Sequence, residues 1–197
     1  TVLDASLIEL NAHADNTADA DALAIAVAGL TIVGIAPGAH VTNAAVVAAS
    51  LGGTADVEDF GATVEARASS TDHAIAKAEG DSGGIVDVKV IHVDASTAGA
   101  TRATVGDGAI LHARSILLDA AATTTPTTSL TSIGVGLISG ASASSTVTDT
   151  HAVSASLGGS SGLGHPGVVT AGDVTIKATS TSQGSINVTL GAGGLGA

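Results

Sequence analysis

The densest group of oxygen ligands in the sequence is an acidic cluster near the start of the chain: Asp15, Asn16, Asp19 and Asp21. Calcium prefers carboxylate and amide oxygens, and the spacing of Asp19 and Asp21 places both carboxylates on one face of a strand. The sequence has neither an EF-hand loop nor the glycine-rich nonapeptide of calcium-loaded β-rolls. The cluster therefore favours a solvated acidic turn, and calcium is the one cofactor left open.

Residues that hold metals or perform catalysis are otherwise scattered. No His-x-x-x-His or His-Glu-x-x-His pair occurs, so we expect the seven histidines on the surface or on strand faces and not in a zinc site: His13, His40, His73, His92, His112, His151 and His165. Nor is there a Gly-x-Ser-x-Gly nucleophile elbow. Asp56, Glu58 and Asp59 resemble the paired carboxylates of glycosidic cleavage. Sugar sites usually present aromatic platforms, however, and Phe60 is the only aromatic residue. We therefore predict no enzymatic activity and assign no catalytic, cofactor-binding or metal-binding residue.

The elements that carry these residues form a repeat. Six apolar positions recur 108 residues further along the chain, and again 58 residues after that. The three sets are Val2, Leu3, Ala5, Ile8, Leu10 and Ala12; Ile110, Leu111, Ala113, Ile116, Leu118 and Ala120; and Val168, Val169, Ala171, Val174, Ile176 and Ala178. Each set makes two short segments with a period of two, which is typical of strands. A polar or small dipeptide separates the two segments and predicts a corner: Ser6-Leu7, Arg114-Ser115 and Gly172-Asp173.

A glycine turn and a third strand recur with this unit. The turns Leu51-Gly52-Gly53, Val105-Gly106-Asp107 and Leu157-Gly158-Gly159 lie 54 and 52 residues apart. Ile133, Val135 and Leu137 return 53 residues later as Ile186, Val188 and Leu190, and Ile25 and Val27 fill a similar place in the first copy. The second copy is degenerate, because Val64 and Ala66 match either segment of the unit.

Local composition predicts where the strands are interrupted. Polar turns are expected at Asp15-Asn16-Thr17 and at Thr123–Thr128, where Pro126 cannot donate to a central ladder. Between Ala18 and Val27, alanines on the even positions alternate with larger or charged residues, and this period of two favours a strand over a helix. The Ser/Gly-rich stretch 158–167 is expected to form a long loop.

These patterns predict an all-β fold, a β-solenoid in which a right-handed parallel β-helix is favoured. Residues 1–197 then form one repetitive segment, with repeats at about 1–59, 60–107 and 108–165 and a partial one at 166–197. Each unit of about 54 residues makes either one wide coil or two narrow ones, and antiparallel pairing of the two halves stays open. The solenoid places two sets of residues inward at equivalent positions: Ile8, Ile116 and Val174, and Leu10, Leu118 and Ile176.

Composition limits the partners of the chain. Its 45% apolar residues are almost entirely aliphatic, which suits a narrow interior between closely spaced strands. A net charge of −12 disfavours nucleic acid and anionic membrane surfaces, because phosphate binding needs clustered Lys and Arg. Residues 22–39 carry no charge, but their glycines, proline and alternation argue against a membrane-inserted helix.

The recurring sequence words resemble those of a known group of proteins. Residues 168–181, VVTAGDVTIKATST, together with Gly106-Asp107-Gly108-Ala109, resemble the repeats of large bacterial surface proteins, the filamentous-haemagglutinin-like and giant-adhesin β-solenoids. In that family, glycine-aspartate turns lead into threonine-valine-alanine alternation, and the repeats serve as a stalk or fibre without catalytic residues. The resemblance covers nearly the whole chain. It implies a solenoid architecture and an extracellular or cell-surface location.

The sequence thus predicts a structural repeat of an extracellular bacterial fibre, sheath or adhesin stalk. The expected partner is the chain itself, by end-to-end association into a filament or within a longer array, because both ends begin or stop near a predicted strand without a capping element. A surface module that contacts calcium or glycans through its loops is the alternative. A polysaccharide-active β-helix enzyme is a more distant one.

Overall fold

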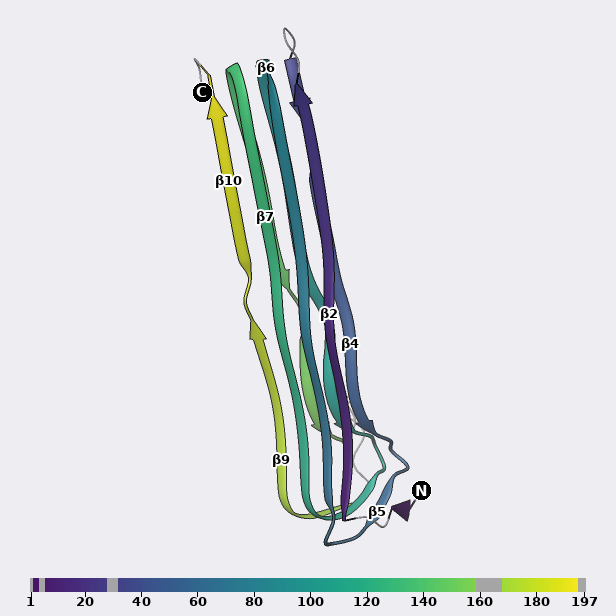
Figure 1. Ribbon diagram of the computed structural model, residues 1–197. Helices are drawn as coiled ribbons and strands as arrows, with labels where there is room; N and C mark the ends of the chain where they lie inside the picture. The colour runs from purple at the N-terminus through teal and green to yellow at the C-terminus, as the bar shows by residue number, and fades with distance from the viewer. Residues whose placement is uncertain (1, 4–5, 28–31, 159–167, 195–197) are drawn as a thin grey trace.

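The computed structural model describes residues 2–3, 6–27, 32–158 and 168–194, and every regular element among them is a β-strand (Figure 1). The strands are β1 (Val2–Leu3), β2 (Leu7–Val27), β3 (Ile32–Ile35), β4 (Gly38–Leu51), β5 (Asp56–Glu58), β6 (Thr63–Val105), β7 (Ile110–Asp149), β8 (Ala152–Leu157), β9 (Val168–Ser182) and β10 (Ser185–Gly193). They form one sheet. The predicted all-β class is therefore confirmed. No helix able to span a membrane occurs in the part of the chain that the structure describes.

All strand pairs between described residues are parallel, so the antiparallel arrangement that the sequence left open does not occur there. Paired residues are far apart in the sequence. Thr63 lies beside Ser115 at a separation of 52 residues, and His13 lies beside Ser69 at a separation of 56. Ile116 lies beside Val174, 58 residues later (174 minus 116). Each long strand thus pairs with the stretch that precedes or follows it by one repeat of the sequence pattern.

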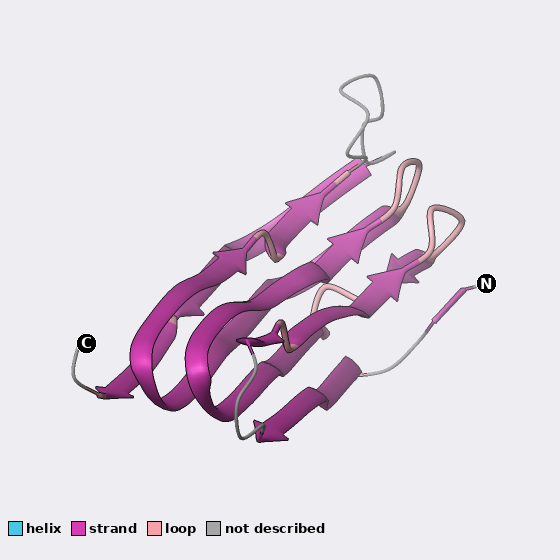
Figure 2. Cartoon of the chain, turned by 90° about the horizontal axis from the view of Figure 1, so that it is seen from above, coloured by secondary structure: helices cyan, strands magenta, loops and turns pink. Residues whose placement is uncertain are grey.

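The sheet is bent into two facing layers (Figures 1 and 2). The first half of β6, residues 63–83, runs along one layer, and the second half, 86–105, returns along the other. The hydroxyls of Ser70 and Thr101 meet at 2.8 Å across the interior, which shows that the two halves face each other. The strand β7 follows the same course, with Thr128 and Ser145 in contact at 2.6 Å. Below, residues 63–83 and their neighbours are called the rising layer, and residues 86–105 and theirs the returning layer.

Alternation decides which side chains fill the narrow space between the layers. In the rising layer the even-numbered residues point inward, and in the returning layer the odd-numbered ones do. Two apolar clusters result. One includes Val64, Val105, Leu111 and Leu118, and the other is made largely of alanines around Ile91 and Leu130. Burying a side chain such as Leu118 contributes roughly 2–3 kcal/mol. Larger residues of the alanine-rich segments, such as Leu23, point outward instead.

The structure resolves the degenerate second copy. Val64 lies beside Ile116 and Ala66 beside Leu118, so these residues belong to the second segment of the unit. The first segment is the short strand β5, in which Val57 lies beside Leu111. The corner at Arg114-Ser115 is also present, because the buried side chains change from odd to even numbers there, between Ala113 and Ile116.

Two predicted turns are wrong. Asp15-Asn16-Thr17 lies inside β2, and Thr123–Thr128 lies inside β7. The asparagine keeps the strand intact because its side chain is satisfied in the interior, where its amide donates to Asp72 (2.9 Å). Pro126 does not end its strand, but its missing amide faces β9 and β10, as the hydrogen bond from the Gln183 amide to the Thr124 carbonyl shows (2.9 Å). The break between β9 and β10 falls at this place (Figure 1).

The predicted equivalence of the third strands is also wrong. Ile186 lies beside Thr128 and Val188 beside Leu130, so Ile186 does not correspond to Ile133. The two apolar triplets lie on opposite faces, since Ile133 points outward while Ile186 follows an inward-pointing row. The first-copy residue Ile25 does share the row of Ile133, through Asp81 between them.

The two sets of predicted inward residues occupy equivalent rows, but their burial differs. Ile116 and Leu118 are fully buried, and Ile8 and Leu10 are half-buried. Val174 and Ile176 lie beside Ile116 and Leu118, as the predicted equivalence requires, but each is 47% exposed. They lie on β9, at the edge of the rising layer, where no described strand of the returning layer covers them in full.

Candidate functional site

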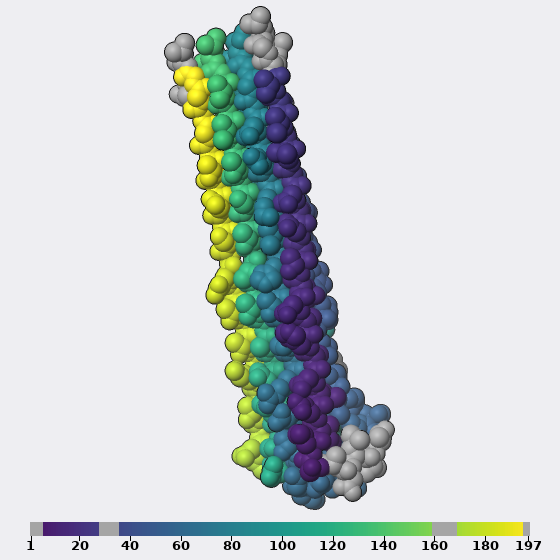
Figure 3. All heavy atoms as spheres, in the orientation of Figure 1, coloured from purple at the N-terminus to yellow at the C-terminus, as the bar shows by residue number. Residues whose placement is uncertain are grey.

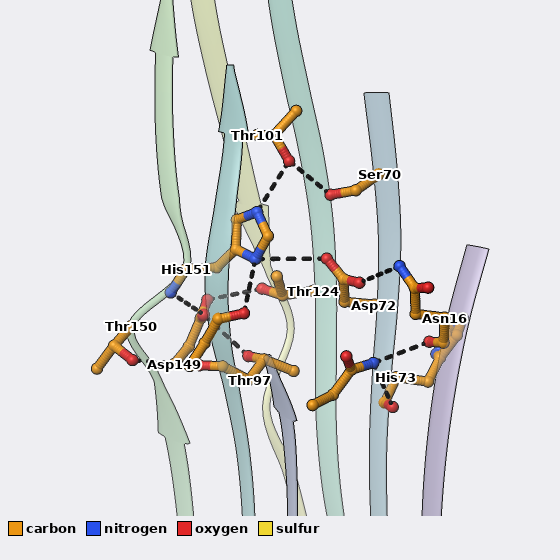
Figure 4. Close-up of polar contacts among 12 residues, drawn as sticks. Asn16, Ser70, Asp72, His73, Thr97, Thr101, Thr124, Asp149, Thr150 and His151 are labelled. Atoms are coloured by element: carbon orange, nitrogen blue, oxygen red, sulfur yellow. Dashed lines mark hydrogen bonds and ion pairs between the residues drawn. The ribbon is translucent and has the colours of Figure 1, made fainter. Parts of the chain in front are cut away.

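A belt of polar side chains crosses the interior between the two apolar clusters (Figure 4). It contains Asn16, Asn43, Ser70, Asp72, Thr97, Thr101, Thr124, Asp149 and His151. They come from both layers: β2, β6 and β7 in the rising one, and β4, β6, β7 and the link before β8 in the returning one. At this height in the molecule, the inward-pointing positions of both layers carry polar residues. Polar side chains from distant parts of the sequence therefore meet in the interior.

The centre of the belt has the atoms of a Ser/Thr-His-Asp relay. Thr101 Oγ1 lies 2.9 Å from His151 Nε2, and His151 Nδ1 lies 3.4 Å from Asp72 Oδ2 and 3.1 Å from the Ala98 carbonyl oxygen (Figure 4). Such an order of groups activates a hydroxyl in hydrolases, provided that a substrate reaches it. Here the side chains of His151 and Asp72 and all of Thr101 are completely buried. In this conformation the relay meets no substrate. The His151 ring makes hydrogen bonds with Thr101 and the Ala98 carbonyl, whereas Asp72 Oδ2 makes no hydrogen bond to the described residues.

The belt has two carboxylates, Asp72 and Asp149. Asp149 is the more exposed of the two and accepts more hydrogen bonds. Thr97 Oγ1 (2.9 Å) and the His151 amide (3.1 Å) donate to Oδ1, and Thr124 Oγ1 donates to Oδ2 (2.6 Å). Burial by itself raises the pKa of Asp149, but hydrogen bonds from Ser182, Thr124, His151 and Thr97 outweigh burial, and the pKa lies below its ordinary value. The ionised form is therefore the one that the belt stabilises.

A second buried polar group lies near the far end of the layers. Lys89 Nζ approaches Asp87 Oδ2 at 3.8 Å, both side chains are inaccessible to solvent, and Lys89 also donates to the carbonyls of Gly80 and Ile133. Ser82 donates to Asp87. At Gly134 any Cβ would collide with the Asp87 carboxylate, so the glycine gives this ion pair its space. Paired and hydrogen-bonded in this way, the two charges are compatible with burial.

The acidic cluster does not converge on a cation-binding geometry. Asp15, Asp19 and Asp21 point outward from β2, whereas Asn16 points inward to Asp72. Lys77 Nζ lies 3.8 Å from Asp19 and 3.7 Å from Asp21, so an ammonium group already occupies the space beside the two carboxylates. Among the described residues, no three His, Asp or Glu side chains are grouped as a metal site would require.

The remaining predicted residues stay apart. His13 pairs with Asp15 (3.4 Å) and His92 with Asp94 (2.5 Å), and the ring of His112 packs at a tilt against Phe60, with the ring centroids 5.1 Å apart. Asp59 accepts a hydrogen bond from the Gly61 amide (2.7 Å) and so stabilises a turn. His165 and nearly all of the predicted loop 158–167 lie outside the described residues.

Two surfaces are open to a partner. The first is an apolar groove on the outer face of the rising layer, lined by Ile25, Val27, Gly83, Ile133, Val135 and Leu137. It is hollow because Gly83 lies between Val27 and Val135 in the same row. The second consists of the sheet edges. Each of β2, β4, β9 and β10 pairs along one side only with a long strand, β6 or β7, and its other side has no partner among the described residues.

Comparison with known protein families, with curated proteins and with solved structures finds no match to this chain.

The polar belt could not be predicted from the sequence, because its residues do not recur at a regular interval along the chain. Asp72, Thr101 and His151 lie on three different passes of the chain, and only the phase of the two layers brings them together. One signal was available. Along each of three neighbouring strands, one polar residue interrupts the apolar residues that point inward. These three residues, Asn16, Asp72 and Thr124, lie side by side in the sheet.

Proposed function

We propose that this chain is a structural segment of an extracellular bacterial fibre, sheath or adhesin stalk, which associates end to end with copies of itself or forms part of a longer array. In this proposal the fold is a right-handed parallel β-solenoid, in which each repeat of about 54 residues makes one wide, flattened coil. The chain has no enzymatic role, binds no nucleic acid and inserts into no membrane.

The observation that carries the proposal is the uninterrupted parallel pairing that ends in two free edges. Pair separations of 52 to 58 residues support one wide coil for each repeat, because no described strand pairs at half that distance. The free edges match in length and position. β2 lies beside residues 63–83, which lie beside 115–135 of β7, and β9 and β10 together cover that same stretch of β7 on its other side. An exposed edge with unpaired amides and carbonyls templates further strands.

End-to-end association is tested by sedimentation across a concentration series, together with negative-stain images. We expect filaments, or a sedimentation coefficient that rises with concentration. A stable monomer at high concentration would contradict the filament.

A variant of the β2 edge makes this test specific. The Thr63 amide donates to the Ser6 carbonyl (3.0 Å), so the even-numbered residues of β2 bond to β6 and the odd-numbered ones face the free edge. Thr17→Pro removes one free-edge amide, and the side chain of Thr17 is exposed. We expect this variant to stay monomeric and Thr17→Val, the matched control, to assemble like the parent chain.

A surface binding module is the second candidate function, and the apolar groove around Ile133 favours it. An exposed apolar hollow rimmed by polar residues is a common feature of interaction sites. Two results would favour the module over the fibre: discrete particles of the chain at all concentrations, and binding of a partner that is lost in the Ile133→Asp variant.

A further inference from the structure

The apolar groove on the outer face of the rising layer contains one charged residue, Asp81. Figure 3 shows this outer face, on which β2, β6 and β7 lie side by side, and the groove lies near the end of β2. Two neighbouring rows of residues cross the three strands there: Val27, Gly83 and Val135, and Ile25, Asp81 and Ile133. A carboxylate therefore lies between two isoleucines, next to the hollow at the glycine.

The carboxylate of Asp81 is shielded from water but has no partner. Its Oδ1 atom is inaccessible to solvent and accepts no hydrogen bond from the described residues. The next cation along this face of β6 is Lys77, but its ammonium group lies beside Asp19 and Asp21 (3.8 and 3.7 Å). A shielded carboxylate oxygen without a donor is unfavourable. A hydrogen-bond donor that enters the groove would remove this cost.

The hollow beside Asp81 is not a packing requirement of the sheet. Gly83 is not among the glycines with a positive φ angle. A Cβ atom added to Gly83 would lie 3.6 Å from the Val135 carbonyl oxygen, which is an ordinary contact. A larger side chain would therefore fit at this position and fill the groove. The glycine keeps open a space that the fold itself does not need.

The walls and the carboxylate together select a class of ligand. Four aliphatic side chains of the walls are each more than half exposed: Ile25, Val27, Ile133 and Val135. A hydrocarbon body would remove them from water. A neutral hydrocarbon would leave Asp81 Oδ1 without a donor, and an anion would bring a like charge to it. An aliphatic body with an ammonium group meets both demands, and the groove volume of about 690 Å³ is that of a small-molecule site.

We propose that this groove binds a small aliphatic ammonium compound. The ammonium group donates a hydrogen bond to the carboxylate of Asp81, and the hydrocarbon body lies in the hollow over Gly83. The site goes beyond the proposed fibre, because strand pairing at the sheet edges leaves this outer face free. It also gives the surface module, the second candidate function, a class of ligand.

The probe is octylamine, which carries an ammonium group at pH 7. Isothermal titration calorimetry measures its binding to the Thr17→Pro chain, in which assembly contributes no heat. We expect saturable binding of one molecule per chain. Octanol has the same hydrocarbon body without the charge, and methylamine has the head group without the body, so each should bind about tenfold more weakly or less. Octanol that binds as tightly as octylamine would overturn this class of ligand.

Paired variants locate the site. Asp81→Asn should weaken the binding of octylamine about tenfold or more. Asp19→Asn, at a carboxylate on the same face that already lies beside Lys77, should change it by less than about twofold. Binding that is unchanged by Asp81→Asn, or weakened equally by both variants, would overturn the role of Asp81.

A second pair of variants tests the hollow. Gly83→Val should fill the groove and abolish binding. Gly140→Val is the matched control, because Gly140 lies beside Val88 in the returning layer and an added Cβ there meets nothing within 4 Å. Melting curves check that each variant folds. Binding that survives Gly83→Val would overturn the site, and the sedimentation test of the fibre would stand unchanged.

Discussion

Few large side chains are fully buried in this interior, and each of them fills the gap between two closely spaced layers. Leu118 is completely buried in the first apolar cluster, together with Val64 and Ile116. Most of its neighbours are alanines and valines, which have little freedom to repack around a changed side chain. Single substitutions in this row therefore report directly on the two-layer packing.

Leu118→Asp should lower the free energy of unfolding by about 3 kcal/mol or more, because an unpaired charge enters an apolar interior. Thermal unfolding should show a fall in Tm of roughly 6–12 °C for a chain of this length. Leu23→Asp is the control, since Leu23 is exposed on the outer face and its replacement should change stability by less than about 0.5 kcal/mol. Equal melting of the two variants would contradict the inward position of Leu118.

The belt carboxylate Asp149 couples stability to pH. Its pKa in the folded chain lies below the ordinary value, because four hydrogen bonds outweigh the effect of burial. A depressed folded pKa contributes stability that is complete above the unfolded pKa and is lost as pH falls through the folded one. His151 and Asp72 are the titratable groups nearest to it in the belt.

Asp149→Asn should therefore destabilise the chain at pH 7, and the difference from the parent chain should shrink as pH falls below about 4. Urea unfolding at a series of pH values measures this. Asp15→Asn, at an exposed carboxylate of β2, is the control. A destabilisation by Asp149→Asn that is the same at pH 7 and at pH 3 would argue against the linkage.

At the scale of the strand, prolines mark where the long elements are broken. Pro37 separates β3 from β4, and its carbonyl accepts a hydrogen bond from the His92 amide (3.3 Å), so its missing amide faces β6. Pro126 acts on its neighbour instead, because it offers no donor to the Gln183 carbonyl at the break between β9 and β10. At both breaks the hydrogen bonding of the strand is interrupted, but the chain continues in the same direction.

Pro126→Ala should restore the missing donor and join β9 to β10. Hydrogen exchange observed by NMR should then show a slowly exchanging amide at position 126, and the Gly184 region should become more protected. Ala120→Ser is the control, because Ala120 also points inward from β7 and the substitution leaves its backbone amide unchanged. A fast-exchanging amide at position 126 would mean that another cause breaks the strand.

The sequence predicts the strands and most of their equivalence, because alternation and glycine turns are local signals that recur. Ile116, for instance, was matched to Val174 from spacing alone, and they lie side by side. The match of Ile133 to Ile186 failed because identical apolar triplets serve opposite faces of the sheet. The sequence does not predict the polar belt, since the belt depends on the phase between two layers. The Lys89–Asp87 pair lies on one face of a single strand, and local alternation does not show that this charged face, and not the face of Val88 and Val90, points inward.

At the scale of the whole molecule, local stability should be highest in the central strands and should fall toward the strands at the edges of the sheet. β6 is paired along both sides, to β2 and β4 on one side and to β7 and β8 on the other, whereas β2, β9 and β10 each have one free edge. In stacked repeats each unit is stabilised only by its neighbours, so terminal units open first. The edges that open most readily are also the ones that association would pair.

Hydrogen exchange of monomers and assemblies should therefore differ at the edges alone. In the monomeric Thr17→Pro chain, we expect protected amides in residues 63–83 and 115–135 and rapid exchange at the free-edge amides of β2, β9 and β10. In assembled parent chains, the amides of β2 and of β9 and β10 should become protected together, because each edge pairs with the other in the next copy. Mass spectrometry of peptide fragments after timed exchange resolves these segments. Protection that rises at β9 and β10 while β2 stays open would contradict head-to-tail pairing, since every such contact uses one edge of each kind.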